Sequence, residues 1–296
     1  MMETQLHAYL HYLMTEKHLA QNSLVSYERD LKHYFTFLKE KNITNFEQVQ
    51  KAHVQQFLRK LHEDKRATSS IMRMLSSIKN FHLYLQLQQI TTHNPASSIE
   101  MAKLAPKVPE YLTIEEVNQL LQLPDTKSLR GVRDRAILEL LYATGLRVSE
   151  CIALKVENVH LDLAYLEFEG KGQKVRILPL GSECVKWLKK YIDHVRPSLM
   201  NSQENQILFF TQQGRAFTRQ GLWKNLKKYV AQLGIQKVVT PQTLRHSLAI
   251  HLLQNGADLA SVQELLGHVD LSTTQMYVQA TKRRLSESYQ QFFPRA

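Results

Sequence analysis

The stretch Ala143-Thr-Gly-Leu-Arg-Val-Ser-Glu150 interrupts a long helical pattern of apolar residues spaced three and four apart. Gly145 is a candidate C-terminal cap, because glycine readily adopts the left-handed conformation that ends many helices. Ser149 is a candidate start for the next helix. Arg147 therefore lies at an element boundary, where its guanidinium can point into a cleft or form a surface ion pair with Glu150.

A second break, near the C-terminus, separates a histidine from a tyrosine. Glu264-Leu-Leu-Gly-His268 predicts a helix that stops at Gly267, and Ser272-Thr-Thr-Gln-Met-Tyr277 predicts the start of another. A free phenol has a pKa of about 10, so it is almost wholly protonated at neutral pH. Tyr277 can act as a nucleophile only where cationic and hydrogen-bonding groups stabilise the developing charge.

The residues between Ala164 and Leu180 change to the period-two alternation of β-strands. The turn Gly170-Lys-Gly-Gln173 divides this segment and predicts a β-hairpin with Lys171 at its tip. After the turn, charged and apolar residues alternate in the order Lys174, Val175, Arg176, Ile177. The turn lacks the G-x-x-x-x-G-K-[ST] spacing of a nucleotide-binding loop. A lone lysine at a hairpin tip is more often solvated than functional.

Two further helical patterns lie between the hairpin and the tyrosine. Thr240-Pro241 predicts a helix start, with Gln242 and Arg245 three residues apart on one face. An earlier helix, within residues 211–234, carries Arg219 and Gln220 in its first turn. Arginine and glutamine at a helix N-terminus suit guanine and adenine edges in a DNA major groove. Plain exposure to solvent is the alternative for this pair.

The first hundred residues contain four apolar stripes at helical spacing and predict a four-helix bundle. The stripes centre on Leu6–Leu13, Tyr27–Leu38, Val54–Leu61 and Ile71–Leu85. The basic residues Lys32, Arg73 and Lys79 lie off these stripes. Such residues usually form a solvated face, and contact with nucleic-acid phosphates is the alternative.

The segment from His93 to Glu110 contains three prolines and cannot continue a helix. We expect a linker with its hinge near Ala105, which divides the chain into domains at residues 1–104 and 105–296. A linker of this kind would let two domains close around a cylindrical ligand. Thr113 and Glu116 predict a capping box that opens the second domain.

The composition is that of a globular protein with a basic surface. The chain has 296 residues, 43% of them hydrophobic, and a formal net charge of +11. Such an excess favours a polyanionic partner, either nucleic acid or a membrane surface. We expect neither a signal peptide nor a membrane span. Cys151 and Cys184 are interpreted as buried, reduced thiols of a cytosolic protein, with no metal-binding spacing.

The five chemical motifs together resemble the ordered signature of the tyrosine recombinase (phage-integrase) family. They are Arg147 in A-T-G-L-R-V-S-E, Lys171 in G-K-G-Q-K, Arg245 in T-L-R-H-S, His268 in L-L-G-H and Tyr277 in T-T-Q-M-Y. Each motif alone is weak, and five in register over the C-terminal domain are specific. The length and layout are similar to the Xer type within this family. The resemblance implies a mainly helical fold, with a SAM-like core-binding domain and an α+β catalytic domain that contains a small β-hairpin or sheet.

The resemblance also implies a mechanism. Arg147 and Arg245 would clamp the scissile phosphate, and Tyr277 would attack phosphorus to form a 3′-phosphotyrosyl link. Lys171 would protonate the leaving 5′-oxygen, while His268 would bond the phosphate or assist the phenol. No metal, ATP or other cofactor is implied. The residues expected to contact DNA are Arg73, Lys79, Lys174, Arg219 and Gln220.

The implied partners follow from the Xer resemblance. They are a double-stranded DNA recombination site and a second Xer-type recombinase in a heterotetramer, and a DNA translocase is suggested as the activator. The implied role is chromosome dimer resolution at cell division, in the cytoplasm and on the nucleoid. No membrane is implied as a partner.

The family pattern before the second arginine is H-x-x-R, whereas this chain has Gln242-Thr-Leu-Arg245. Glutamine keeps a hydrogen-bond donor but does not titrate. If proton transfer were the role, its loss would cost about 10²- to 10⁴-fold in rate. We expect an active enzyme. The alternatives are an integrase of a mobile element and, because of Gln242, a weakly active or non-catalytic DNA-binding relative.

Overall fold

The computed structural model describes residues 2–100, 109–170, 175–200 and 206–267. The chain forms two compact units, residues 1–104 and 105–296. Each unit has its own hydrophobic core. Lys171, Lys174, His268 and Tyr277 lie outside the described residues, as does the predicted hinge near Ala105.

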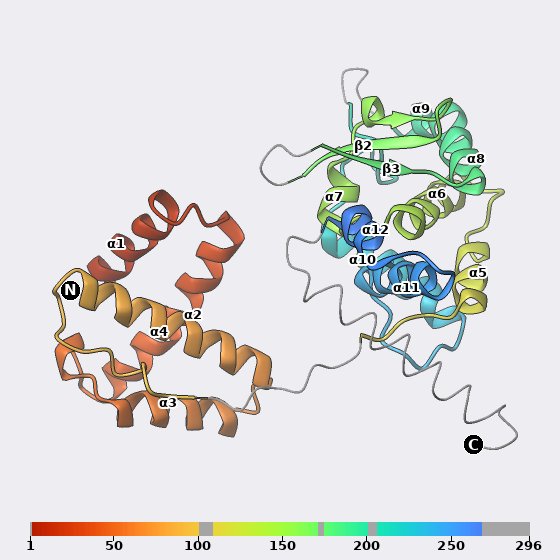
Figure 1. Cartoon of the computed structure of the whole chain (residues 1–296). Helices are drawn as coiled ribbons and strands as arrows, with labels where there is room; N and C mark the ends of the chain where they lie inside the picture. Colours follow the sequence, from red (N-terminus) through yellow and green to blue (C-terminus); the bar gives the residue numbers. More distant parts are fainter. Residues whose placement is uncertain (1, 101–108, 171–174, 201–205, 268–296) are drawn as a thin grey trace, which may run out of the picture. The chain divides into compact units, whose positions relative to one another are not determined.

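The first unit confirms the four predicted helices (Figure 1). They are α1 (Met2–Thr15), α2 (Gln21–Glu40), α3 (Lys51–Glu63) and α4 (Thr68–Leu87), with a 3-10 turn at Phe46–Gln48. The predicted stripes face inward, because Leu31, Tyr34, Val54 and Ile71 are all fully buried. Burial of these stripes, rather than helix propensity alone, stabilises helices of this length.

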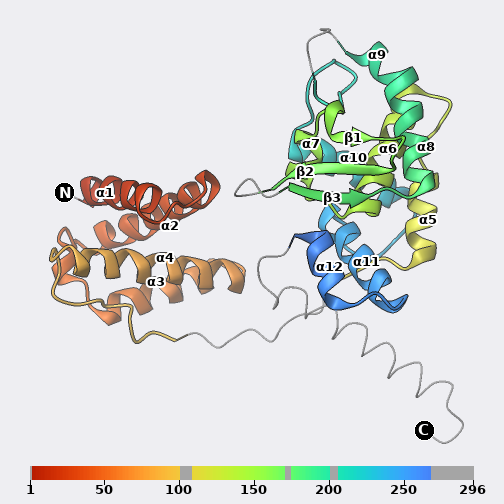
Figure 2. The same ribbon diagram turned by 45° about the horizontal axis from the view of Figure 1, so that its top comes forward.

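The second unit is helical with one small antiparallel sheet (Figure 2). Its first helices are α5 (Ile114–Gln122), α6 (Leu129–Thr144) and α7 (Val148–Ala153), and a 3-10 turn follows at Val156–Asn158. The sheet has the order β1 (Val159–His160), β2 (Tyr165–Glu169), β3 (Val175–Pro179). The later helices are α8 (Ser182–Lys190), a π-helical segment Tyr191–Val195, α9 (Arg196–Leu199), α10 (Arg219–Gln232), α11 (Pro241–Gln254) and α12 (Leu259–Leu266).

Helix α6 is the central element of the second unit. It packs against α8, α11 and β3, so that the sheet and α11 lie on different sides of it (Figures 1 and 2). The predicted interruption after it is confirmed, since Gly145 ends α6 with a φ of 61°. The predicted start at Ser149 is wrong: α7 begins at Val148, and its N-cap is Arg147. The Glu150 side chain bonds the Arg147 backbone N–H and thereby satisfies a donor at the helix start.

The two predicted hairpin strands are confirmed as β2 and β3, and the short strand β1 was not predicted. Leu166 pairs with Leu178, and both are buried. This register turns Val175 and Ile177 outward, with 55% and 68% exposure. Arg176 therefore faces inward. The buried leucines set the phase of the strand, because a shift by one residue would expose them.

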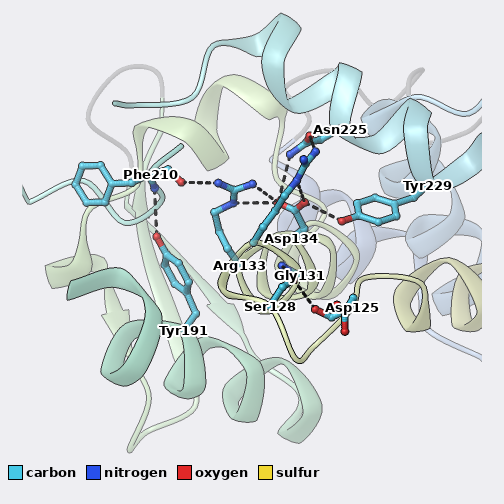
Figure 3. A network of polar contacts seen from close by, with 10 residues as sticks. Asp125, Ser128, Gly131, Arg133, Asp134, Tyr191, Phe210, Asn225 and Tyr229 are labelled. Carbon is cyan, nitrogen blue, oxygen red and sulfur yellow. Dashed lines mark hydrogen bonds and ion pairs between the residues drawn. The ribbon is translucent and has the colours of Figure 1, made fainter. Parts of the chain in front are cut away.

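A buried ion pair joins the N-terminal half of α6 to its neighbours (Figure 3). Arg133 donates to Asp134 Oδ1 from Nε at 2.9 Å and from Nη2 at 2.7 Å, and from Nη1 to the Phe210 carbonyl at 3.2 Å. Tyr229 on α10 donates to Asp134 Oδ2 at 2.8 Å, and Asn225 donates to Oδ1 at 3.3 Å. These bonds give both charges hydrogen-bond partners and thereby offset the free-energy cost of removing the pair from water.

Gly131 in the first turn of α6 permits a close backbone contact. A Cβ at this position would lie 1.8 Å from the Asp125 carbonyl oxygen. We therefore expect Gly131→Ala to lower the unfolding free energy of the second unit by about 1–3 kcal/mol, as overpacking does. A lower urea midpoint in circular dichroism would show the loss. Gly181→Ser is the control, since a Cβ there meets nothing within 4 Å; equal midpoints for the two variants would contradict the prediction.

Candidate active site

Arg147 reaches the site from the turn between α6 and α7. Its Nη1 donates to Glu150 Oε1 at 2.8 Å, and its side chain is 41% exposed. The predicted ion pair with Glu150 is therefore confirmed, and the guanidinium is still partly exposed to solvent. Its orientation into a cleft stays a prediction. The turn needs glycine at position 145, because a Cβ there would lie 2.7 Å from a Leu266 methyl group.

Arg245 reaches the same turn from α11 and is only 1% exposed. Its Nη1 donates to the Gly145 carbonyl, and its Nη2 donates to the Leu266 carbonyl at 2.6 Å. The Gly145 carbonyl belongs to the turn that carries Arg147. The structure thus brings together two arginines that lie 98 positions apart in the sequence (245 − 147).

Two residues that sequence reasoning did not select also belong to this site. Glu150 accepts hydrogen bonds from Arg147, and Arg176 on β3 donates to Glu150 Oε1 at 3.4 Å. Arg176 also donates to the Leu266 carbonyl at 2.8 Å. Spacing indicated Glu150 only as an ion-pair partner. Arg176 lies in a strand of alternating charged and apolar residues. The sequence alone does not define which of the two sets faces inward.

Gln242 lies in the first turn of α11 and is exposed, whereas Arg245 is buried. The predicted helix start is confirmed, because Thr240 caps α11 through a bond to the Thr243 N–H at 3.2 Å. His246 follows Arg245 and is half-buried. Burial lowers the pKa of the His246 imidazole, and the Arg245 charge lowers it further. The neutral form of His246 is thereby favoured.

The remaining predicted catalytic residues can be placed only by sequence. Lys171 directly follows Gly170 at the end of β2, and His268 directly follows Gly267. Gly267 ends α12 with a φ of 62° and so confirms the predicted helix stop. Lys171, His268 and Tyr277 remain predictions, and so does Lys174.

The other predicted DNA contacts lie in both units. Arg219 and Gln220 are exposed in the first turn of α10, after the N-cap Thr218. In the first unit, Arg73 forms an ion pair with Asp30, which is fully buried. Lys79 is half-buried on the same helix, α4. DNA binding by these residues stays a prediction.

A pocket of about 660 Å³ lies beside the start of α10. Its cationic lining residues are Arg130, Arg133, Arg215, Lys224 and Lys228. Asp134 pairs with Arg130 and Arg133 of α6. Among the described residues, the other three form no ion pair with a carboxylate at the distance of a salt bridge, so the pocket is a positively charged hollow.

Cys151 and Cys184 are free and buried, as predicted, and burial raises the pKa of Cys151 to about 12. Over the described ranges, no group of three or more His, Cys, Asp and Glu residues could hold a metal ion. None of the described helices is long and apolar enough to cross a membrane.

Two family models match the chain, one in each unit. The model of the phage integrase family matches residues 110–284, and that of the phage integrase N-terminal SAM-like domain matches residues 6–89. Among curated relatives, tyrosine recombinase XerD of Oceanobacillus iheyensis is 45% identical over 298 residues, and that of Staphylococcus haemolyticus is 42% identical over 295. Each alignment covers 100% of both chains.

Solved structures show the same architecture. The crystal structure of XerA recombinase is 25% identical, with a TM-score of 0.55 over 99% of this chain and 100% of that one. The XerH site-specific recombinase, bound to its palindromic difH substrate, has a TM-score of 0.79 at 22% identity. That alignment covers 96% of this chain and 83% of the XerH chain. The second likeness concerns the fold alone.

Proposed function

This chain belongs to the phage integrase family of tyrosine recombinases, and we propose that Arg147, Arg245 and Tyr277 form its site for DNA strand cleavage. It is a site-specific recombinase similar to XerD, an enzyme that cuts and rejoins DNA at a recombination site. The observation that supports the proposed site is the meeting of Arg147 and Arg245 at one turn, next to the end of α12. His268 follows that helix end after a single residue.

The two arginines suit a phosphodiester by charge and by geometry. A guanidinium presents five N–H donors in a planar fork and stays protonated at neutral pH. Two of them beside one phosphate stabilise the extra negative charge that develops on its non-bridging oxygens. Among the described residues, the single carboxylate of Glu150 is shared between the guanidiniums of Arg147 and Arg176. The proposed clamp thus favours the transition state over the bound DNA.

The proposed reaction conserves the energy of the phosphodiester bond. The Tyr277 phenol gives its proton to His268 as its oxygen attacks phosphorus, the bond from phosphorus to the 5′-oxygen breaks, and Lys171 supplies the proton to that oxygen. The products are a 3′-phosphotyrosyl link and a free 5′-hydroxyl. The 5′-hydroxyl of another strand then returns a proton to Lys171 and attacks the link, so that a new phosphodiester forms and Tyr277 leaves with the proton that His268 held.

The biological setting is proposed from the relatives. We infer resolution of chromosome dimers in the cytoplasm, on a DNA recombination site, with a second recombinase of the XerC type in a tetramer. A DNA translocase is the inferred activating partner. The full-length match to XerD proteins favours this role over that of a mobile-element integrase.

The assignment of Tyr277 as the nucleophile is tested with a duplex that contains the recombination site and a nick. Cleavage near the nick releases a short strand that diffuses away, so the covalent intermediate accumulates. We expect the wild-type protein to form a covalent adduct with DNA that survives denaturation. Tyr277→Phe should abolish the adduct, because it removes the attacking oxygen, and should leave binding within about two-fold in a gel-shift measurement. An undiminished adduct in this variant would refute the assignment of Tyr277.

The role of Gln242 is tested by two substitutions. Gln242→Ala removes a donor, and we expect single-turnover cleavage to slow by about 10- to 100-fold, the value of a hydrogen bond to a charged group. Gln242→His keeps a donor and should stay within about ten-fold of wild type. It should also add a rate dependence near the histidine pKa of about 6.5. Acceleration of 100-fold or more by histidine would show instead that proton transfer is the role.

The cationic pocket beside α10 is proposed to hold DNA phosphates. These phosphates would flank the DNA major groove that Arg219 and Gln220 are proposed to enter. Each phosphate contact releases condensed counterions, so the slope of log affinity against log salt measures their number. We expect Lys224→Ala and Lys228→Ala each to reduce the magnitude of this slope by about 1. The control is Lys186→Ala on α8, which should change nothing, because Lys186 is exposed and pairs with Glu183. Unchanged slopes in the pocket variants would exclude it from the interface.

A further inference from the structure

Arg176 faces the interior, and its two apolar neighbours on β3 face solvent. Its side chain is only 16% exposed, whereas Val175 and Ile177 are exposed on the other face. The guanidinium lies over the Phe168 ring at 5.1 Å, and Phe168 is its cross-strand partner. The cation–π contact and the strand pairing hold the side chain in one orientation.

Arg176 shares one acceptor with each of the two arginines of the proposed clamp. Its Nη2 and Arg147 Nη1 both donate to Glu150 Oε1, at 3.4 and 2.8 Å. Its Nη1 and Arg245 Nη2 both donate to the Leu266 carbonyl, at 2.8 and 2.6 Å. One planar guanidinium therefore connects the supports of both clamp residues.

We propose that Arg176 is a positioning residue that holds Arg147 and Arg245 in fixed relation to one another through Glu150 and the Leu266 carbonyl. The inference rests on the proposed function of the two arginines. Arg176 would not touch the phosphate in this role. It would act by dividing the Glu150 carboxylate between two guanidiniums, so that Glu150 cannot fully neutralise Arg147.

The backbone around Arg176 is shaped to admit this side chain. A Cβ at position 267 would lie 2.0 Å from Arg176 Nη1, so only glycine leaves room for it. Gly267 therefore serves two purposes, because its φ of 62° also ends α12. The same residue precedes His268, so the contact fixes the chain immediately before another proposed catalytic residue.

The experiment measures single-turnover cleavage of the nicked duplex by Arg176→Ala and Arg176→Lys. We expect Arg176→Ala to slow cleavage by about 10- to 100-fold, as the loss of a supporting residue does. Binding should stay within about two-fold. Arg176→Lys should recover only part of the rate, because lysine keeps the charge but lacks the fork that bridges two acceptors. The matched control is Lys186→Ala, which removes an exposed cation from the same unit.

A second DNA substrate separates positioning of the clamp from a general loss of structure. A methylphosphonate at the scissile position lacks one charged oxygen and needs less neutralisation by arginine. If Arg176 acts through the clamp, the defect of Arg176→Ala should shrink to less than about three-fold on this DNA, relative to wild type, as the transition-state charge that the clamp stabilises is reduced. An equal defect on both DNAs, or no defect on ordinary DNA, would overturn the proposal.

A third substrate identifies a different cause. With a sulfur in place of the bridging 5′-oxygen, the leaving group departs as a thiolate and needs no proton. Recovery of Arg176→Ala on this DNA alone would assign the defect to leaving-group protonation and also overturn the proposal. Wild-type protein that forms no adduct on ordinary DNA would instead refute the proposed function. If Arg176→Ala does not fold by circular dichroism, Arg176→Lys and the same three substrates decide the question.

Discussion

The left-handed turn at Gly145 is the constraint on which the proposed site depends. It ends α6, directs Arg147 to the start of α7, and presents its carbonyl to Arg245 of α11. A side chain at position 145 would collide with Leu266 at the end of α12. Helices α6, α7, α11 and α12 therefore meet at a position that has room for backbone but not for a side chain. The guanidinium of Arg245 lies between the carbonyls of Gly145 and Leu266. Both of these bonds from Arg245 go to backbone carbonyl oxygens, which carry no net charge.

The two ends of α6 contribute to two different regions of the second unit. At the C-terminal end lie the turn and the proposed clamp. At the N-terminal end, the buried pair of Arg133 and Asp134 joins α6 to α10 (Figure 3). The cation-lined pocket lies beside this second region. A helix that is packed along its length can hold a phosphate-binding surface and a cleavage site at a fixed separation, and a reaction on a regular duplex needs such a separation.

Charge balance links the proposed chemistry to the packing. Arg147 and Arg176 share the Glu150 carboxylate, and Arg176 and Arg245 share the Leu266 carbonyl. Among the described neighbours of Arg245, His246 is held toward its neutral form by burial and by the Arg245 charge. Gln242 cannot titrate at all. The described part of the site is thus a fixed positive field with few groups that change protonation near neutral pH, which suits stabilisation of charge more than transfer of protons.

Local sequence determined the elements of this protein, and tertiary structure decided which residues meet. Apolar periodicity and caps predicted the four helices of the first unit, the helix after Thr240 and the stops at Gly145 and Gly267, because these signals act within a few residues. Ordered motifs were enough to indicate the family. The start of α7, the inward face of β3 and the partners of Arg245 could not be predicted locally. Alternation along a strand has two possible phases, and only the pairing of Leu166 with Leu178 chose the one that turns Arg176 inward. Contacts between distant segments, such as Arg245 with Gly145 and Arg176 with Leu266, arise when α6, α11, α12 and β3 pack around one core.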